Sequence, residues 1–262
     1  MKKEYSLALG GGAAIGLLHI GIIKYIEEQN IIIKEVSGTS MGSIIASLYA
    51  LGISSKEMLS FAEKIKMLKM LDLDLSSGLL KGNKIVKKLY EIIGDELIEK
   101  QKIKLKIITT NISTGEKKVF TKGKIIDAIR ASISIPGIFK PQKIGGDYYI
   151  DGGVLNNLPI EVLEGKNIIA VSALKKIEGK IKDKKKLFGL NLKTGFFNMN
   201  AQILERALLL MMKSNELKSL KTKNKNIIFI HPDTPGIEIY SFSKVKKLVD
   251  IGYKEISEVT KL

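Results

Sequence analysis

The sequence predicts an α/β fold in which a mostly parallel central sheet lies between two layers of helices. Short apolar runs rich in Ile and Val alternate with longer amphipathic segments along most of the chain. Several of these runs are apolar throughout, which is typical of parallel strands buried on both faces. The chain has 262 residues, of which 45% are hydrophobic, enough for one large core. We therefore expect a single domain over residues 1–262, with the motif-bearing core at about 5–160 and residues 161–262 completing the sheet and its helices.

The expected elements follow from periodicity and from turn residues. Short β-branched runs bounded by Gly, Asn or Ser predict strands at 5–9, 31–36, 104–110, 117–121, 167–172 and 226–230, and a hairpin at 142–150. Longer segments with apolar residues three or four positions apart predict helices at 16–29, 41–51, 54–71, 83–93, 124–131, 199–219 and 244–260. The lysine-rich stretch 175–186 is expected to be a mobile loop.

Composition narrows the functional classes. The chain has no Cys and two His, which excludes disulfides, thiolate metal sites and His-rich metal sites, so we expect no metal and no cofactor. The net charge of +16 comes almost entirely from Lys and favours anionic partners such as a membrane surface or nucleic acid. With two Arg in the whole chain, specific nucleic-acid recognition is not expected. Solvated lysine faces are the plainer explanation of the charge.

The first 23 residues imitate a secretory signal without its full pattern. Glu4 interrupts the charged region, and the glycines at 10–12 break the apolar segment. No apolar run approaches the ~18 residues that a membrane-spanning helix needs. We expect a cytoplasmic protein, with membrane association as an alternative, and make no prediction of its oligomeric state.

The clearest chemical motif is Gly38-Thr39-Ser40-Met41-Gly42, between an apolar strand and an apolar helix. A sharp turn from strand to helix places the middle serine in a strained conformation, and the flanking glycines avoid clashes with neighbouring backbone. The serine hydroxyl then lies beside a helix N-terminus, where negative charge is favoured. This context predicts that Ser40 is a nucleophile rather than an ordinary helix cap.

A nucleophilic serine needs a base, and the sequence offers several candidates. His231 follows a strand and would complete a serine–acid–histidine triad, although the serine turn comes early for that topology. His19 lies inside the first predicted helix, where a packed or capping histidine is the commoner reading. Asp151 ends a strand and precedes Gly152 and Gly153, which indicates a tight, exposed turn.

A glycine-rich segment opens the first helix, Gly10-Gly11-Gly12-Ala13-Ala14-Ile15-Gly16. Its backbone N–H groups meet at a helix N-terminus and could bind an oxyanion or a phosphate. The spacing matches neither the dinucleotide nor the nucleoside triphosphate loop, so nucleotide binding is the weaker interpretation.

Together these motifs resemble the patatin-like phospholipase family. The glycine loop at 10–21 is similar to that family's oxyanion loop, residues 38–43 to its nucleophile turn, and residues 151–160 to its acid motif. Arg130-Ala131-Ser132-Ile133-Ser134-Ile135-Pro136-Gly137 resembles the segment that precedes the acid.

The resemblance implies an α/β/α fold and hydrolysis of fatty-acyl esters of lipids, as in a lipase or phospholipase A. By position, Ser40 would be the nucleophile and Asp151 its base, with no histidine needed. The N–H groups of Gly11, Gly12 and Ala13 would stabilise the oxyanion. The chain departs from the family at Ile15, where a basic residue is usual, which puts the preference for phospholipid in doubt more than ester hydrolysis.

Two further expectations concern partners. The predicted helix around 201–212 is apolar round much of its circumference, which indicates core packing or, alternatively, a lid or membrane-docking face. The alternatives to a lipase are an esterase or thioesterase for small soluble substrates and an inactive basic protein that binds membrane or nucleic acid.

Overall fold

The computed structural model describes residues 3–64, 73–74, 79–175, 186–187, 190–191 and 195–259. Its strands are β1 (Glu4–Leu9), β2 (Ile32–Thr39), β3 (Leu73–Asp74), β4 (Leu79–Leu80), β5 (Lys104–Asn111), β6 (Glu116–Phe120), β7 (Gln142–Ile144), β8 (Asp147–Asp151), β9 (Asn167–Val171), β10 (Lys186–Leu187), β11 (Leu190–Asn191) and β12 (Asn226–Ile230). Its α-helices are α1 (His19–Glu28), α2 (Met41–Ala50), α3 (Ser55–Lys64), α4 (Asn83–Ile93), α5 (Ile125–Ser132), α6 (Gly195–Ser219) and α7 (Val245–Val259).

The main sheet is mixed, with a parallel part and an antiparallel part. Its order is β12-β9-β1-β2-β5-β8-β7, and β6 also pairs with β5. The first five strands of this order run parallel, whereas β6, β7 and β8 pair antiparallel. The predicted mostly parallel sheet is confirmed, and β9 and β12 from the C-terminal part of the chain extend its parallel side.

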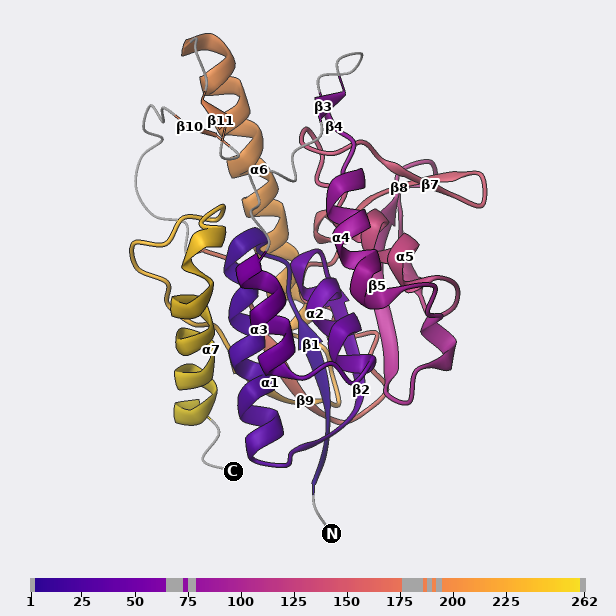
Figure 1. The fold of residues 1–262 in the computed structure, drawn as a ribbon, viewed down its shortest axis with the longest axis vertical. Helices are drawn as coiled ribbons and strands as arrows, with labels where there is room; N and C mark the ends of the chain where they lie inside the picture. Colours follow the sequence, from indigo (N-terminus) through magenta and orange to yellow (C-terminus); the bar gives the residue numbers. More distant parts are fainter. Residues whose placement is uncertain are drawn as a thin grey trace.

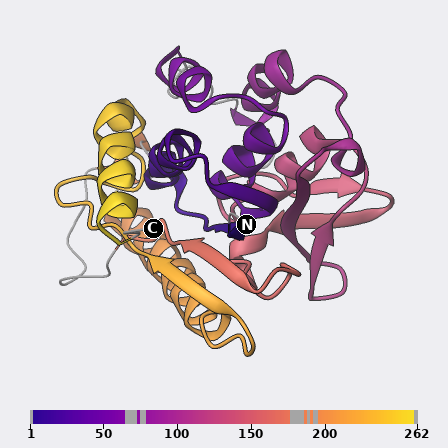
Figure 2. The ribbon, with the colours of Figure 1, turned by 90° about the horizontal axis from the view of Figure 1, so that it is seen from below.

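Helices cover both faces of this sheet, as predicted. Helices α1, α2, α3 and α7 lie over one face, and α6 lies over the other (Figures 1 and 2). Alternate residues of β1 follow this division, because Leu7 and Leu9 join the larger core while Ala8 packs against Leu158 and Ile160 on the opposite face. The layers are therefore helix, sheet and helix.

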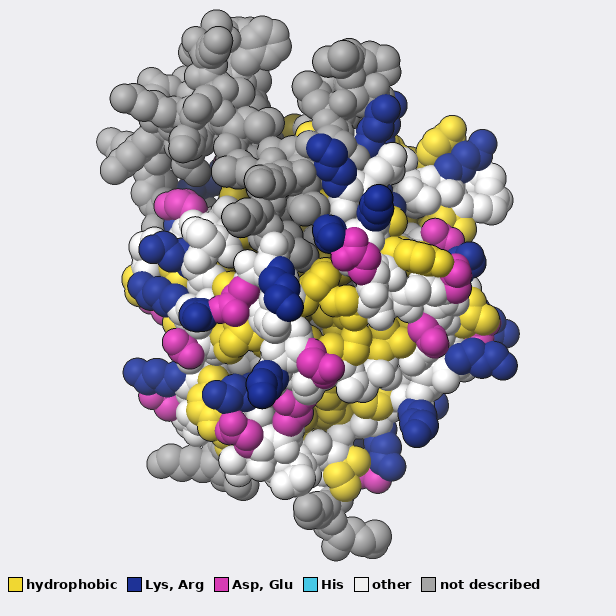
Figure 3. All heavy atoms as spheres, in the orientation of Figure 1, with side chains coloured by type: hydrophobic (Ala, Val, Ile, Leu, Met, Phe, Trp, Pro, Cys, Tyr) yellow, Lys and Arg dark blue, Asp and Glu magenta, His cyan; other side chains and the backbone are white. Residues whose placement is uncertain are grey.

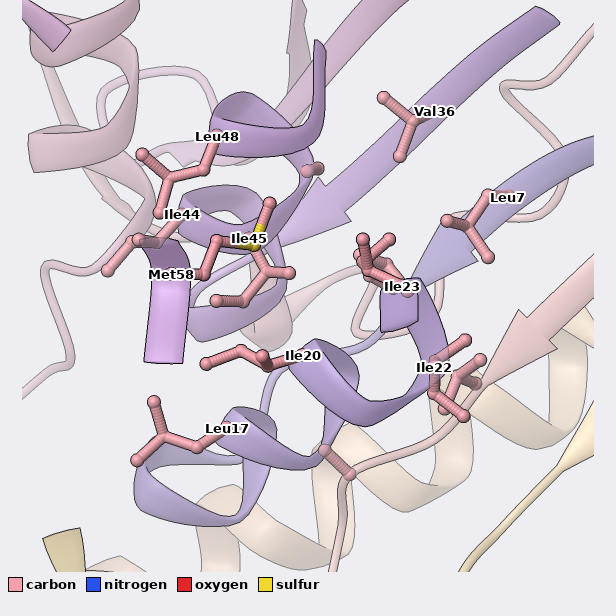
Figure 4. Packing of buried hydrophobic residues seen from close by; sticks show 14 of the residues in the cluster. Leu7, Leu17, Ile20, Ile22, Ile23, Val36, Ile44, Ile45, Leu48 and Met58 are labelled. Atoms are coloured by element: carbon pink, nitrogen blue, oxygen red, sulfur yellow. The ribbon is translucent and has the colours of Figure 1, made fainter. Parts of the chain in front are cut away.

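The larger core is built from aliphatic side chains. Figure 4 shows Leu17, Ile20, Ile45 and Met58 converging from η1, α1, α2 and α3, where η1 (Ala13–Leu18) is a 3-10 helix. These helices meet α4 around an apolar pocket, and hydrophobic side chains gather at the centre of this face in Figure 3. Lysine and acidic side chains are interspersed on the same face (Figure 3), which favours solvated charges there over a single basic patch.

Some element boundaries differ from the sequence prediction. The first helix begins as the 3-10 helix η1 and becomes α-helical at His19, three residues later than expected. Strand β2 continues past Val36 to Thr39, because its last residues pair with both β1 and β5. Helix α3 is described as far as Lys64, so the rest of the expected helix, 65–71, lies outside the described residues, as does most of the expected lysine-rich loop.

Candidate active site

Ser40 stands alone between β2 and α2 in a strained backbone conformation. Its φ is +53°, which a residue with a side chain rarely adopts. The backbone packs too closely here for side chains at the flanking glycines. A Cβ added to Gly38 would lie 2.4 Å from the Gly42 carbonyl oxygen, and one added to Gly42 would lie 2.2 Å from the Leu9 carbonyl oxygen. The Gly-x-Ser-x-Gly spacing is therefore a steric requirement of this turn.

The buried hydroxyl of Ser132 holds the serine turn in place through two hydrogen bonds. The Ser40 N–H donates to Ser132 Oγ at 2.9 Å, and Ser132 Oγ in turn donates to the Ile108 carbonyl at 2.7 Å. Ser132 ends α5, and Ile108 lies in β5. In the sequence Ser132 is only one residue of the segment before Asp151, and no spacing assigns it this contact with Ser40.

Asp151 lies beside Ser40 because β2 and β8 pair with the same edge of β5. Residues Ile107 and Ile108 pair with both β2 and β6, so these strands flank β5 on opposite sides. Thr109 and its successors pair with β6 and β8, so β8 lies on the same side as β2. Thr39 pairs with Ile108 and Asp151 with Thr109, hence the two strands meet end to end.

The Asp151 carboxyl is fully buried and poorly solvated. Its Oδ1 accepts a hydrogen bond from the Gly153 N–H at 2.8 Å, while Oδ2 makes no aligned hydrogen bond with any described residue. Burial raises the pKa of Asp151 to about 6, against the opposing effects of the Ser40 hydroxyl and the Gly153 N–H. The Ser40 hydroxyl therefore lies close enough to stabilise the charged carboxylate, without a fully aligned bond.

The two glycines after Asp151 are also required by close packing. A Cβ on Gly152 would lie 2.4 Å from the Ile108 oxygen, and one on Gly153 would lie 2.6 Å from Met212 Cε. The short 3-10 turn Gly152–Val154 can thus press against β5 and α6 while the carboxyl of Asp151 caps its start.

The glycine loop is held so that two of its N–H groups remain unused. The C=O and N–H of a trans peptide point in opposite directions. The Gly11 carbonyl accepts from Asn157 Nδ2 at 3.1 Å, so the Gly12 N–H of that peptide points away from Asn157. The Gly12 carbonyl accepts from the Ile15 N–H at 3.1 Å, so the Ala13 N–H points away from η1. Within the described residues, neither N–H has a partner.

Gly11 differs from its two neighbours. Its N–H donates to the Asn157 carbonyl at 3.2 Å, whereas we expected a free donor at this position. His19 Nε2 donates to the Gly10 carbonyl at 2.8 Å and so fixes the same peptide from its other end. A Cβ on Gly11 would meet Asn157 Oδ1 at 2.7 Å and Ser40 Cβ at 3.0 Å, so Gly11 brings the loop against the nucleophile.

A pocket opens beside Ser40, Gly12 and Ala13. Most of its wall is apolar and comes from the segment before Asp151, from α6 and from the loop before α7. The remaining lining residues are Ile135, Leu174, Lys175, Glu205, Leu208, Leu209, Met212, Ile239 and Tyr240. Ser40 and the two loop residues with unused N–H groups therefore line the same, largely apolar space.

Neither histidine reaches the serine. His231 Nε2 lies 2.9 Å from the Leu174 carbonyl, and His19 is buried under the glycine loop with its pKa lowered to about 4 by desolvation, against the opposing effect of its bond to Gly10. His19 is thus neutral at physiological pH and serves the loop as a donor. Ile15 is 1% exposed and packs in the larger core, away from the residues that line the pocket.

Comparison with known proteins identifies the family. The model of the patatin-like phospholipases matches residues 7–164, more than half of the chain. The chain belongs to the patatin-like phospholipase family. The matched range includes the glycine loop, the serine turn and the Asp151 segment. Among the described residues, no group of three or more His, Asp or Glu side chains is arranged to hold a metal ion, and no helix is long and apolar enough to cross a membrane.

Relatives of this patatin-like chain are longer proteins. An uncharacterised NTE family protein of Mycobacterium tuberculosis is 34% identical over 178 residues, which are 65% of this chain and 49% of that protein. A lysophospholipase of Yarrowia lipolytica is 34% identical over 179 residues, which are 66% of this chain and 12% of that protein. The chain thus spans half or less of the length of these relatives.

The fold has a counterpart of known structure. VipD from Legionella pneumophila matches 98% of this chain and 66% of its own, with a TM-score of 0.55 and 16% sequence identity. The predicted three-layer patatin-like architecture is therefore confirmed.

Proposed function

We propose that this patatin-like chain is a serine acyl hydrolase that cleaves fatty-acyl esters of lipids, with Ser40 as nucleophile and Asp151 as base. The observation that carries the proposal is the end-to-end meeting of β2 and β8 on one edge of β5, which brings the serine and the carboxylate together. The unused N–H groups of Gly12 and Ala13 support it, because they open into the same pocket as Ser40.

In the first half of the reaction, Asp151 takes the proton of Ser40 as its Oγ attacks the ester carbonyl. The N–H groups of Gly12 and Ala13 bind the oxyanion that forms. When the intermediate collapses, the C–O bond to the alcohol breaks and Asp151 returns the proton to the leaving alcohol. In the second half, Asp151 takes a proton from water, the hydroxide attacks the acyl-enzyme, and Ser40 leaves with that proton.

A carboxylate is a weak base for a serine hydroxyl, and the site offsets this in two ways. Burial raises the pKa of Asp151 to about 6, which makes the ionised carboxylate more basic than an exposed one. The fixed donors of the loop stabilise charge as it forms, where losing one donor typically costs about 3 kcal/mol. Gly11 contributes by holding the loop, since its own N–H is used by Asn157.

Hydrolysis of p-nitrophenyl esters by the wild type and by Ser40→Ala tests the proposal. We expect turnover that increases with acyl chain length in the wild type and none in the variant. Assays on a lysophospholipid and a diacyl phospholipid follow, because the fungal relative is named a lysophospholipase. Preference for short soluble esters would favour a small-molecule esterase, and equal activity of both proteins would exclude Ser40 as nucleophile.

Contact with a membrane surface is a second part of the proposal and depends on α6. Leu208, Leu209 and Met212 of α6 line the pocket. Other apolar side chains of the same helix are 40–53% exposed, at Ile203, Leu204, Leu210, Met211 and Leu217. Spacings of seven residues align Ile203, Leu210 and Leu217 along one side of the helix. This exposed stripe and the net charge of +16 suit an anionic lipid surface.

Flotation with anionic and neutral vesicles at low salt tests this contact. We expect the protein to float with anionic vesicles and the double variant Leu210→Ser/Met211→Ser to float less. Val259→Ser, which removes an exposed apolar side chain of α7, is the matched control. Failure of the wild type to float with either vesicle would refute membrane contact and leave the hydrolase proposal intact.

A further inference from the structure

Helix α6 carries two adjacent polar residues that are buried beneath the glycine loop. Asn215 and Glu216 are 8% and 5% exposed. They lie outside the matched family range, 7–164, and no motif in the sequence marks them. A buried carboxylate is costly unless it accepts hydrogen bonds, so its partners indicate its purpose.

Both residues bind Asn157 or its immediate surroundings. Glu216 Oε1 accepts from Asn157 Nδ2 at 2.7 Å, and Oε2 accepts from Ser172 Oγ at 2.9 Å. Asn215 Oδ1 accepts from the Asn157 N–H at 2.7 Å, and Asn215 Nδ2 donates to the Gly153 carbonyl at 2.8 Å. The backbone and side chain of Asn157 are therefore both fixed by α6.

Asn157 transmits this restraint to the glycine loop. Its carbonyl accepts from the Gly11 N–H, and its Nδ2, bound to Glu216, also donates to the Gly11 carbonyl. Because Nδ2 faces two acceptors, the orientation of the amide is determined. A Cβ on Gly10 would lie 3.2 Å from Glu216 Oε1, so the carboxylate is directly against the loop. Loss of Glu216 would free the peptide that orients the Gly12 N–H.

We propose that Asn215 and Glu216 are positioning residues that hold the oxyanion loop in its active conformation through Asn157. The proposal rests on the hydrolase function proposed above. It assigns the buried face of α6 two tasks on successive turns, one in lining the substrate pocket and one in fixing the donors that act on the bound ester. The segment that carries the family motifs would then depend on a helix from the last quarter of the chain.

The required feature of Glu216 is an acceptor at Oε1 and not a charge. Burial raises the pKa of Glu216 to about 7, so that both protonation states occur near neutral pH. In either state Oε1 can accept from Asn157, while Oε2 accepts from Ser172 Oγ when the carboxyl is ionised and can donate to it when protonated. Gln supplies the same acceptor and donor, whereas Leu has the size but neither group.

The test compares Glu216→Leu with Glu216→Gln and with Ser219→Ala. Ser219 is also buried on α6, one turn further on, but its hydroxyl donates toward Asn156 and Glu161 and not toward the loop. We measure kcat and KM on a p-nitrophenyl ester, inhibition by a trifluoromethyl ketone that mimics the tetrahedral intermediate, and deuterium exchange of the loop peptide.

We expect Glu216→Leu to lower kcat by about 100-fold, a loss typical of misplaced catalytic groups, while KM stays near the wild-type value. Binding of the ketone should weaken by a similar factor, and exchange of the loop should accelerate. Glu216→Gln and Ser219→Ala should leave kcat, ketone binding and loop exchange near their wild-type values. Asn157→Ala should reproduce the Leu variant, which guards against a folding defect specific to one substitution.

Three outcomes would overturn the inference. Glu216→Leu could keep the wild-type kcat, or its loop could exchange as in the wild type. Its loss of activity could also coincide with thermal unfolding and be shared by Ser219→Ala. Failure of the proposed function itself has a different signature, namely a wild type whose ester hydrolysis is absent or unaffected by Ser40→Ala. In that case Asn215 and Glu216 have no role in catalysis, and the exchange measurement still shows whether Glu216 holds the loop.

Discussion

Replacement of Asp151 by Asn should stabilise the protein while abolishing hydrolysis. The Asp151 carboxyl is fully buried, and burial raises its pKa from the ordinary value of 3.8 to about 6. The folded protein therefore holds this proton more tightly than the unfolded chain, and stability falls as the pH rises from about 4 through 6. At about 1.4 kcal/mol per pKa unit, the ionised carboxylate costs about 3 kcal/mol above pH 6.

Asn removes this cost and can keep the observed contacts. Its side-chain oxygen can accept from the Gly153 N–H, and its NH₂ can donate to the Ser40 hydroxyl. The assay is urea unfolding of both proteins at pH 4 and at pH 8. We expect the difference in free energy of unfolding, variant minus wild type, to be about 2.4 kcal/mol larger at pH 8 than at pH 4, because the unfolded carboxyl is already partly ionised at pH 4.

Asp147→Asn is the matched control for this change of charge. Asp147 begins the strand that Asp151 ends, and it is partly exposed and bound to Asn111. A stability difference for Asp151→Asn that does not change with pH, or that equals the control, would contradict a raised pKa for Asp151. It would mean that the carboxylate is well solvated and that its environment does not prepare it as a base.

Four further predictions follow from the same geometry. Ser40→Gly should be more stable than Ser40→Ala by about 1 kcal/mol or more in urea unfolding, because Gly relieves the strain at φ +53°; equal stability would contradict this. kcat/KM should fall as the pH drops below about 6, where Asp151 becomes protonated; a profile that is flat down to pH 4 would exclude it as the base. His231→Ala should retain ester hydrolysis, and its loss would restore a histidine triad. Arg130→Met should lower the free energy of unfolding by about 3 kcal/mol, since the buried guanidinium donates to Ser134 and to two carbonyls; a loss below about 1 kcal/mol would contradict this.

The parts of the fold that sequence predicts best are those fixed by local periodicity. The apolar runs of β1 and β9 gave their positions, since a strand buried on both faces needs no partner to be recognised. The run of β12 also predicted its position, although this edge strand is only partly buried. The serine turn was also predictable, because Gly38 and Gly42 are required by contacts within a few residues of Ser40 or with the neighbouring strand.

Long-range features of the site could not be predicted in this way. Nothing in the sequence of β8 indicates that it continues the edge of β5 that β2 occupies, yet this pairing brings Asp151 to Ser40. Nor does the sequence indicate that the Asn157 carbonyl, 146 residues away, accepts a hydrogen bond from the Gly11 N–H. Periodicity predicts that a helix residue such as Glu216 is buried or exposed, but not which loop it fixes.

Helix α6 shows how an ambiguous pattern resolves into two roles. Its apolar residues suggested either core packing or an exposed docking face. In the structure Leu208 and Met212 are buried at the pocket, whereas Leu210 and Met211 are 53% and 41% exposed. The pattern is ambiguous because both surfaces are apolar, and composition does not distinguish a pocket wall from an outer surface.

The proposed function requires that Ser40 is a nucleophile activated by Asp151. Its most direct test is the reaction with a fluorophosphonate, which forms a covalent bond with activated serines, followed by peptide mass spectrometry. We expect a single adduct on Ser40, no adduct on Ser40→Ala, and much slower labelling of Asp151→Asn. An adduct on another residue, or labelling of Ser40 at the wild-type rate without the Asp151 carboxylate, would contradict the account.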